Sequence, residues 1–335
     1  MANQAQAPRG RGRRRRLPLP LLLAAQSRML VGGQAVIEGV MMRVPGAYAV
    51  AVRDPEGEII TERKAFTSAV ERRRWLRLPL LRGVVHLFES LKIGLATLNW
   101  SADVAYPDEG PAEGSASNVW STVVALVVGA GLFFVAPLWI TTRLLTLEQN
   151  ALGFNLVSGA IRITFFLAYL GLISLLKEVQ RLFQYHGAEH KAVYTFEAGK
   201  PLTVESTHEF PTQHPRCGTS FIFIVLIAAI LAFAVIDTVV IALLGNISLG
   251  VRLLVHLPLI PVVAGVGYEA LKLTARHQSI ALFRWLSLPG IWLQFITTKQ
   301  PDEDQVTVAL DSLKAAFGDR LSEVEGRRYT ADAIA

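Results

Sequence analysis

The chain has 335 residues, of which 52% are hydrophobic and only 18% are charged, whereas soluble domains carry about 25% charged residues. This balance excludes an intrinsically disordered chain and disfavours a wholly soluble globule. The net charge is +6, but residues 1–28 contain seven arginines and no acid, so the rest of the chain carries +6 − 7 = −1. The basic charge belongs to a tail, and we expect no nucleic-acid partner.

The tail begins like a signal peptide, with a basic run before an apolar one. Its apolar part is short and contains Pro18 and Pro20, which disfavour a helix. We therefore interpret residues 1–28 as a disordered basic tail near anionic lipid headgroups. The single cysteine, Cys217, excludes an intramolecular disulfide, so nothing indicates an oxidising compartment.

Residues 29–118 predict a small cytoplasmic α+β region. AYAVAVRD and EIITERKAF are typical of two strands, with a turn at residues 55–57. The glycines of VGGQAVIEGVMMR indicate tight backbone before them. From Leu81, apolar residues recur at helical spacing, which predicts an amphipathic helix that packs on the sheet or lies on a membrane surface. Residues 101–118 are polar and rich in Gly, Pro and Ser, and predict a linker.

Four segments are apolar enough to cross a bilayer, whose core takes about 20 apolar residues per helix. They are 119–142, 156–176, 219–244 and 253–273. We predict a mainly α fold, a multi-pass helical membrane protein with four transmembrane helices over 119–273 and a cytoplasmic loop at 177–218. The alternative topology has two spans that form one long hairpin.

The loop charges predict the orientation. The short links around 147–155 and 245–250 contain no Lys or Arg, whereas the N-terminal region, the central loop and the C-terminal region hold nearly all of them. The positive-inside rule places both termini and the central loop in the cytoplasm. We expect the inner (plasma) membrane, with the lipid bilayer as one partner.

Three charged residues, Arg162, Asp237 and Arg252, lie near the predicted outer ends of the spans. A charge in a bilayer is costly unless it is paired or lies near the interface. We expect an intramembrane ion pair between Asp237 and one of the arginines. The alternative is three side chains that reach the interface separately.

Residues 274–335 predict an interfacial and cytoplasmic C-terminal segment. ALFRWLSLPGIWLQFITT is apolar and contains Trp285 and Trp292, which favour a membrane interface. Pro289 and Gly290 predict a break within it. Residues 306–317 predict a short helix.

The central loop contains H-x-x-E-H, formed by His186, Glu189 and His190. On a helix the two histidines lie on one face, one turn apart, and can share a zinc or similar divalent cation. Glu189 is then placed to act as a base on a metal-bound water, as in H-x-x-E-H peptidases. We expect this helix to be an extension of the second span, because no stop signal follows Leu176. The alternative is a solvated polar helix face.

A metal needs at least a third protein ligand. We expect it from His214 or Cys217, since a thiolate suits zinc. Four further residues are predicted to complete or flank the site, namely Glu38, Glu205, His208 and Glu269. We interpret His86 and His277 as surface histidines, and expect His256 to bond neighbouring backbone.

Five blocks together resemble the YqhQ-like bacterial membrane proteins, domain-of-unknown-function family 1385: VGGQAVIEGVMMR, LRGVVHLFESLKIG, YHGAEHKAVYTFEAG, HPRCGTSF and PGIWLQFITTKQPDEDQVTVAL. The resemblance covers about residues 29–313. It implies a multi-pass membrane protein and a metal-dependent enzyme without a settled substrate. It places family motifs on His186, Glu189, His190, His214 and Cys217, and on Gly33, Glu38 and Arg43.

Two functions follow as hypotheses. The first is a cytoplasm-facing metal-dependent hydrolase with Glu189 as base, acting on a lipid headgroup or a membrane-protein segment. The second is a non-catalytic scaffold or regulator of a membrane-protein complex, with a structural metal or none. Transport is disfavoured, because the spans lack multiple inward polar groups. No oligomeric state follows from the sequence.

Overall fold

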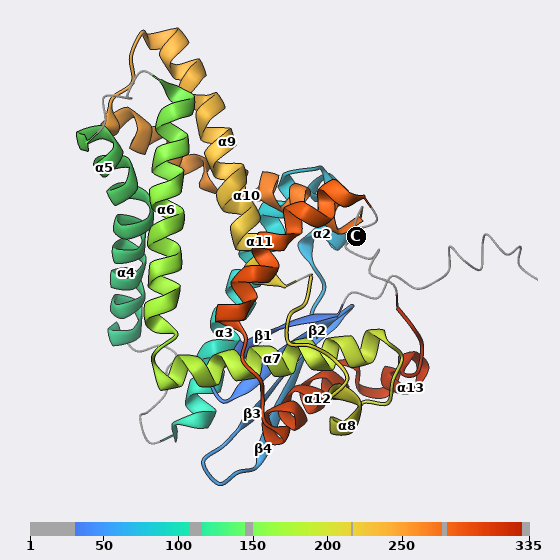
Figure 1. Ribbon diagram of the computed structural model, residues 1–335. Coiled ribbons are helices and arrows are strands. Elements are labelled where there is room, and N and C mark those ends of the chain that lie inside the picture. The colour runs from blue at the N-terminus through green and yellow to red at the C-terminus, as the bar shows by residue number, and fades with distance from the viewer. Residues whose placement is uncertain (1–30, 108–115, 145–149, 216, 277–279, 330–335) are drawn as a thin grey trace, which may run out of the picture.

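The computed structural model describes residues 31–107, 116–144, 150–215, 217–276 and 280–329. Figure 1 shows a bundle of long helices at one end and a small sheet enclosed by helices at the other. The chain enters the sheet first, leaves for the bundle and returns twice.

The sheet is a four-stranded antiparallel meander in the order β1-β2-β3-β4. Its strands are β1 (Gly32–Val36), β2 (Gly39–Val44), β3 (Ala47–Arg53) and β4 (Ile59–Ala65). The predicted strands at β3 and β4 and the turn between them are confirmed. The β1–β2 hairpin was not predicted, because its glycines obscure the alternation of apolar residues that marks a strand. Its turn places Glu38 at a φ of 48°.

Helices cover both faces of the sheet. Helix α3 (Leu81–Ala105) packs on one face, and α7 (Lys177–Glu197) and α12 (Glu303–Phe317) pack on the other. Alternation along the strands explains this, since Val40 and Met42 enter the core with α7 and α12 while Met41 enters the core with α3. The central strands β2 and β3 are thus buried on both sides by helices from three distant parts of the chain.

The structure decides one alternative for the N-terminal region and changes one expectation. Helix α3 packs on the sheet through Ile93 and Ala105, yet Phe88 and Leu91 on the same helix remain 57% and 60% exposed. Residues 101–105 continue this helix rather than starting a linker, because Ala105 is buried against the sheet. Residues 108–115 of the predicted linker lie outside the described residues.

Four of the described helical segments are long and apolar enough to cross a membrane, which agrees with the predicted number. They are Trp120–Leu144, Ala151–Ile173, Ile222–Leu244 and Leu249–Thr274. The first comprises α4 (Ala116–Ala130), a π-helical turn η3 (Gly131–Val135) and α5 (Ala136–Leu144), and the others lie in α6 (Ala151–Ile173), α9 (Gly218–Leu244) and α10 (Leu249–Arg276). The second and fourth begin a few residues earlier than the sequence predicts.

The expected continuous extension of the second span is wrong. Helix α6 ends at Ile173, and α7 begins after Leu176, whose backbone is extended with φ −75° and ψ 135°. The side chain of Gln180 donates to the carbonyl of Ser174 at 3.1 Å across this junction. Figure 1 shows α7 running across the end of α6. The break lets α7 leave the bundle and pack on the sheet.

Helix α11 (Ala281–Thr297) continues through Pro289, so the predicted break there is wrong. Trp285 and Trp292 are 70% and 62% exposed, as suits an interfacial segment. The predicted C-terminal helix is confirmed as α12, and Asp302 and Gln305 form a reciprocal capping box at its start. The short elements are α2 (Ala69–Arg72), η1 (Arg74–Arg77), α8 (Val204–Thr207), η4 (Gly318–Arg320) and α13 (Leu321–Val324).

Candidate metal centre

Helix α7 brings His186 and His190 together, because residues four apart lie on one helix face. Their ring centroids are 4.4 Å apart. The face is not solvated: His190 is only 2% exposed and Glu189 5%. The alternative of a solvated polar helix face is therefore wrong for Glu189 and His190, which lie in the interior, while His186 is half-buried.

Backbone carbonyls orient both imidazoles. Nδ1–H of His186 donates to the carbonyl oxygen of Thr297 at 2.7 Å, and Nδ1–H of His190 donates to that of Thr212. A carbonyl only accepts, so each ring carries its proton on Nδ1 and keeps Nε2 as a lone-pair donor. Metal-binding histidines are oriented in this way.

Cys217 completes a cluster of three. Its Sγ lies 3.1 Å from Nε2 of His186, and one potential ligand atom from each of Cys217, His186 and His190 lies within 4.8 Å of the others. The buried Nε2 of His190 faces the Cys217 thiol and has no well-formed hydrogen bond among the described residues. A buried nitrogen without a bond is costly, and a cation at this position would satisfy it. Two imidazoles and a thiol are donors that suit zinc.

The cysteine is held by the loop before α9. The backbone N–H of Cys217 donates to the carbonyl of His214 at 3.2 Å. The side-chain amide of Gln294 on α11 fixes His214 in turn, since it accepts from the His214 N–H at 2.7 Å and donates to its carbonyl at 2.9 Å. Helix α11 therefore supports the loop that carries the sulfur.

Gly187 allows the chain after α11 to approach α7. A Cβ at this position would lie 2.1 Å from the carbonyl oxygen of Lys299. The close approach is fixed by the Lys299 N–H, which donates to the carbonyl of Phe183 at 2.9 Å. It brings the Thr297 carbonyl to His186. The glycine within H-G-A-E-H is thus part of the site.

Glu189 lies between the sheet and the histidines. Gly33 of β1 donates a backbone hydrogen bond to it, and a Cβ on Gly33 would lie 2.9 Å from Cγ of Glu189. Oε2 of Glu189 is 3.5 Å from Nε2 of His190. Burial raises the pKa of Glu189 and lowers the pKa of His190. The carboxylate is therefore beside the cluster and shielded from bulk water.

His214 lies next to the cluster but outside it. Its ring centroid is 5.6 Å from that of His190, and its Nε2 is 3.5 Å from Oε2 of Glu197. Burial lowers the pKa of His214 to about 4, which favours a neutral ring. Of the two residues predicted to supply the third ligand, the structure brings Cys217 into the cluster.

Comparison with known proteins places the chain in a family. Residues 78–319 match the family described as "Protein of unknown function (DUF1385)". The chain belongs to this family. It is also similar to "Uncharacterized protein YqhQ" of Bacillus subtilis (strain 168), with 32% identity over 294 residues that cover 84% of this chain and 90% of the relative. No solved structure matches the chain.

In this DUF1385 chain, the four residues predicted to complete or flank the site lie elsewhere. Glu38 forms an ion pair with Arg181, and Glu269 forms one with Arg82. Glu205 is exposed on α8, and His208 lies 3.9 Å from Glu303. None of them belongs to the three-residue cluster.

Asp237 and Arg252 of the long helices belong to a separate polar cluster. Asp237 accepts from Nε of Arg252 at 3.0 Å and from the amide of Asn155 at 2.7 Å. Nε2 of His256 lies 2.8 Å from Oδ1 of the same carboxylate. The expected hydrogen bond from His256 to neighbouring backbone is therefore replaced by one to Asp237. Arg162 lies apart and donates to the carbonyl of Phe133 at 2.8 Å.

Sequence reasoning missed the groups that position the ligands. The carbonyls of Thr212 and Thr297 carry no side-chain signature, and Lys191 was not singled out. This lysine is 3% exposed, and its Nζ donates to the carbonyls of Phe210 at 2.8 Å and Thr207 at 3.3 Å. It thereby fixes the loop that presents Thr212. The one signal in the sequence for this close packing was Gly187, the glycine within H-G-A-E-H.

Proposed function

We propose that this protein is a membrane-embedded metal-dependent hydrolase whose His186, His190 and Cys217 hold a divalent cation, zinc by its donor preference. The observation that carries the proposal is the inward cluster itself. Three ligand atoms lie within 4.8 Å of one another, and backbone carbonyls orient both imidazoles. Three protein ligands leave a tetrahedral ion one open position, which is typical of catalytic zinc.

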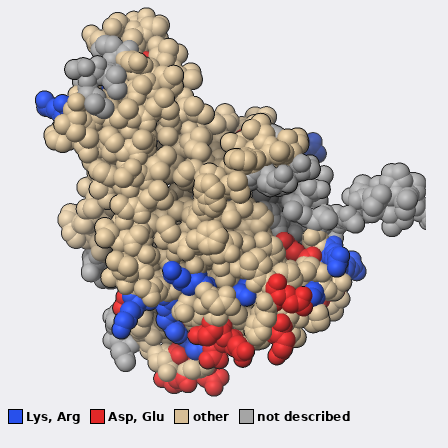
Figure 2. Space-filling view, in the orientation of Figure 1, with Lys and Arg blue, Asp and Glu red and all other residues tan. Residues whose placement is uncertain are grey.

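The membrane part of the proposal rests on the long helices. Leu126, Leu231 and Leu254 are among many apolar side chains exposed on them, at 68%, 56% and 75%. Figure 2 shows Lys, Arg, Asp and Glu gathered at the end of the molecule that holds the sheet, α7 and α12, while the helical end is almost free of them on this face. A bilayer around the helices removes this apolar surface from water. The loop charges support an orientation in which the sheet and both termini face the cytoplasm at the inner membrane.

The chemistry follows from the ligands and their neighbour. When bound, the cation supplies Lewis-acid activation of a water molecule. The Nε2 atoms of His186 and His190 and the sulfur of Cys217 would hold it. Glu189 would act as the general base, and the 3.5 Å distance from its Oε2 to Nε2 of His190 supports this role. The Gly33 N–H holds this carboxylate against the sheet.

The substrate class follows from the position of the site. Helix α7 begins directly after the second apolar helix, so the cluster is close to the proposed membrane surface. A hydrolase there acts on a lipid headgroup or on a segment of a membrane protein. Both carry ester, phosphoester or amide bonds that an activated water can attack.

The first experiment measures bound metal. Protein purified in detergent without a His-tag should carry about one zinc per chain by mass spectrometry, and the His186→Ala/His190→Ala double variant should lose it. His208→Ala is the matched control, because this histidine is exposed and outside the cluster. Folded wild-type protein that binds no zinc, even after reconstitution, would refute the metal centre.

The second experiment separates base from ligand. Glu189→Gln should keep the metal and lose hydrolysis of lipid or peptide substrates, because it retains shape and loses the proton acceptor. Loss of about a hundredfold or more is expected for a general base. Retained activity, or loss of zinc from this variant, would remove Glu189 from that role.

The burial of the cluster favours a second function. His190 and Cys217 are 2% and 6% exposed, which suits a structural metal in a non-catalytic scaffold or regulator of a membrane-protein complex. X-ray absorption at the zinc edge distinguishes the two. Three protein ligands and one water support the hydrolase, and four protein ligands support the scaffold.

A further inference from the structure

A cavity of about 440 Å³ lies between the sheet, α3 and α10, with lining residues that do not include the three metal ligands. Its volume is in the range of small-molecule sites. Apolar side chains from the sheet and α3 form much of its wall, among them Met41 and Ile93. A few polar groups enter this wall, which is the usual composition of a binding pocket.

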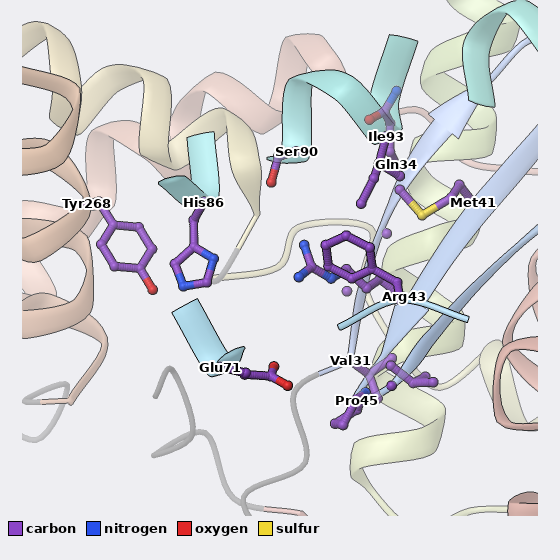
Figure 3. A pocket seen from close by; sticks show the side chains of 15 residues that line it. Val31, Gln34, Met41, Arg43, Pro45, Glu71, His86, Ser90, Ile93 and Tyr268 are labelled. Carbon is purple, nitrogen blue, oxygen red and sulfur yellow. The ribbon is translucent and has the colours of Figure 1, made fainter. Parts of the chain in front are cut away.

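The main polar group in the pocket is Arg43 on β2. Figure 3 shows its guanidinium pointing across the pocket toward His86 and Tyr268. The guanidinium stacks on an aromatic ring, because Cζ of Arg43 lies 4.5 Å from the centre of the Phe66 ring. No carboxylate among the described residues forms an ion pair with Arg43 within 4.0 Å. Burial lowers the pKa of this guanidinium, although it remains charged at neutral pH.

The wall opposite Arg43 is closely packed. Helices α3 and α10 meet at Gly83 and Gly265, where a Cβ on Gly83 would lie 3.0 Å from the Cα of Gly265. Arg82 and Glu269 form an ion pair across the same contact. The contact holds His86 of α3 beside Tyr268 of α10, with ring centroids 5.4 Å apart. The pocket is therefore formed before any ligand binds.

The segment that borders the pocket is basic and aromatic. Glu71 lines the pocket, and the next residues, Arg72, Arg73 and Arg74, are all exposed. Trp75 follows and is 56% exposed. Clustered arginines attract phosphate-bearing surfaces, and tryptophan favours the headgroup layer of a bilayer.

We propose that this pocket binds a phosphate ester that also carries an amine, with Arg43 holding the phosphate and Glu71 the amine. A guanidinium matches a phosphate with two parallel hydrogen bonds, and Glu71 is the acid that lines the same cavity. This chemistry is that of a phosphoethanolamine headgroup, from a membrane phospholipid or from a soluble ester. The inference does not rest on the hydrolase, because it uses none of the metal-cluster residues.

The test uses full-length protein in detergent without added metal. Glycerophosphoethanolamine binding is measured by calorimetry, and retention of phosphatidylethanolamine and phosphatidylglycerol by native mass spectrometry. Arg43→Gln should weaken phosphate-ester binding at least about tenfold, the loss expected for a hydrogen-bonded charge. Glu71→Gln should weaken only the amine-bearing ligands. Arg63→Gln is the matched control, because Arg63 lies on β4 and bonds to Ala316 of α12.

The outcomes separate the sources of the ligand. Binding of both the soluble ester and the lipid, each dependent on Arg43, identifies the headgroup as sufficient. Binding of phosphatidylethanolamine alone, again dependent on Arg43, identifies a bilayer lipid as the ligand. Wild-type protein that binds none of the probes, or Arg43→Gln that binds them equally well, overturns the proposal.

Thermal unfolding would reveal whether Arg43→Gln misfolds. A second variant tests the pocket without changing Arg43. Ser90→Phe places a ring at the wall formed by α3, where Ser90 is exposed and lines the pocket. It should block binding while Arg43 stays intact. Unchanged binding by a folded Ser90→Phe variant counts against the pocket as the binding site.

Discussion

Gly187→Ala tests whether one close approach builds the metal centre. A Cβ at this position would lie 2.1 Å from the carbonyl oxygen of Lys299, and ordinary contact begins at 3.4 Å. The chain after α11 must therefore move by about 1.3 Å (3.4 − 2.1). The same movement would lengthen the 2.7 Å bond between His186 and Thr297 to as much as about 4 Å, beyond hydrogen-bonding range.

Two effects should follow from Gly187→Ala. The free energy of unfolding should fall by about 1–3 kcal/mol, the usual cost of overpacking. This exceeds the gain of up to about 1 kcal/mol from replacing a helical glycine by alanine. Zinc affinity should fall about 10- to 100-fold, as it does when the group that orients a metal ligand is lost.

The assays are thermal unfolding in detergent and competitive zinc titration. Gly171→Ala is the matched control, because it is also a helical glycine and its Cβ would meet no atom within 4 Å. This control should be neutral or slightly stabilising and should bind zinc like wild type. A Gly187→Ala protein with wild-type stability would show that α7 and the chain after α11 do not pack as described. Wild-type zinc affinity despite lower stability would show that Thr297 does not orient a ligand.

Two further predictions concern charges away from the cluster. Asp237→Ala leaves Arg252 buried without its carboxylate, so stability should fall by about 3–5 kcal/mol. Asp311→Ala breaks an exposed ion pair with Lys314 and should change the free energy of unfolding by less than about 1 kcal/mol. Similar losses in the two variants, measured by thermal unfolding, would contradict the buried pairing of Asp237 with Arg252. Burial lowers the pKa of His86 below its ordinary value of 6.5, although Glu89 opposes this and Arg43 and Lys272 add to it. The unfolded chain then takes up a proton first, so stability is full above about pH 6.5 and is lost as the pH falls below it. His86→Gln should flatten this loss between pH 7 and 5, and parallel pH curves for the two proteins would refute the assignment.

Local patterns in the sequence determined much of the secondary structure. Runs of apolar residues predicted four long helices, because a bilayer-length helix needs nothing but length and hydropathy. Two strand-forming runs separated by a turn predicted β3 and β4, and the capping pattern around Asp302 agrees with the start of α12. The H-x-x-E-H spacing placed His186 and His190 on one face, since this depends on helix geometry alone.

The tertiary structure decided where these elements meet. The sequence did not show that α12 packs on the N-terminal sheet. The two elements are far apart in the chain, and only contacts between their side chains bring them together. It also did not show the break after Ile173, because residues 174–176 include no Gly or Pro that would mark a helix end. The break lets α7 bury its apolar face.

The choice of a third ligand shows the same limit. His214 and Cys217 are three residues apart, and composition treats them as equal candidates. Only the backbone path before α9 turns the sulfur toward His186 and leaves the His214 ring beside Glu197. Chemical residue types and helical spacing are local, and the sequence determines them. Which carbonyl orients a ring, and which donor completes a cluster, depends on chain segments that only folding brings together.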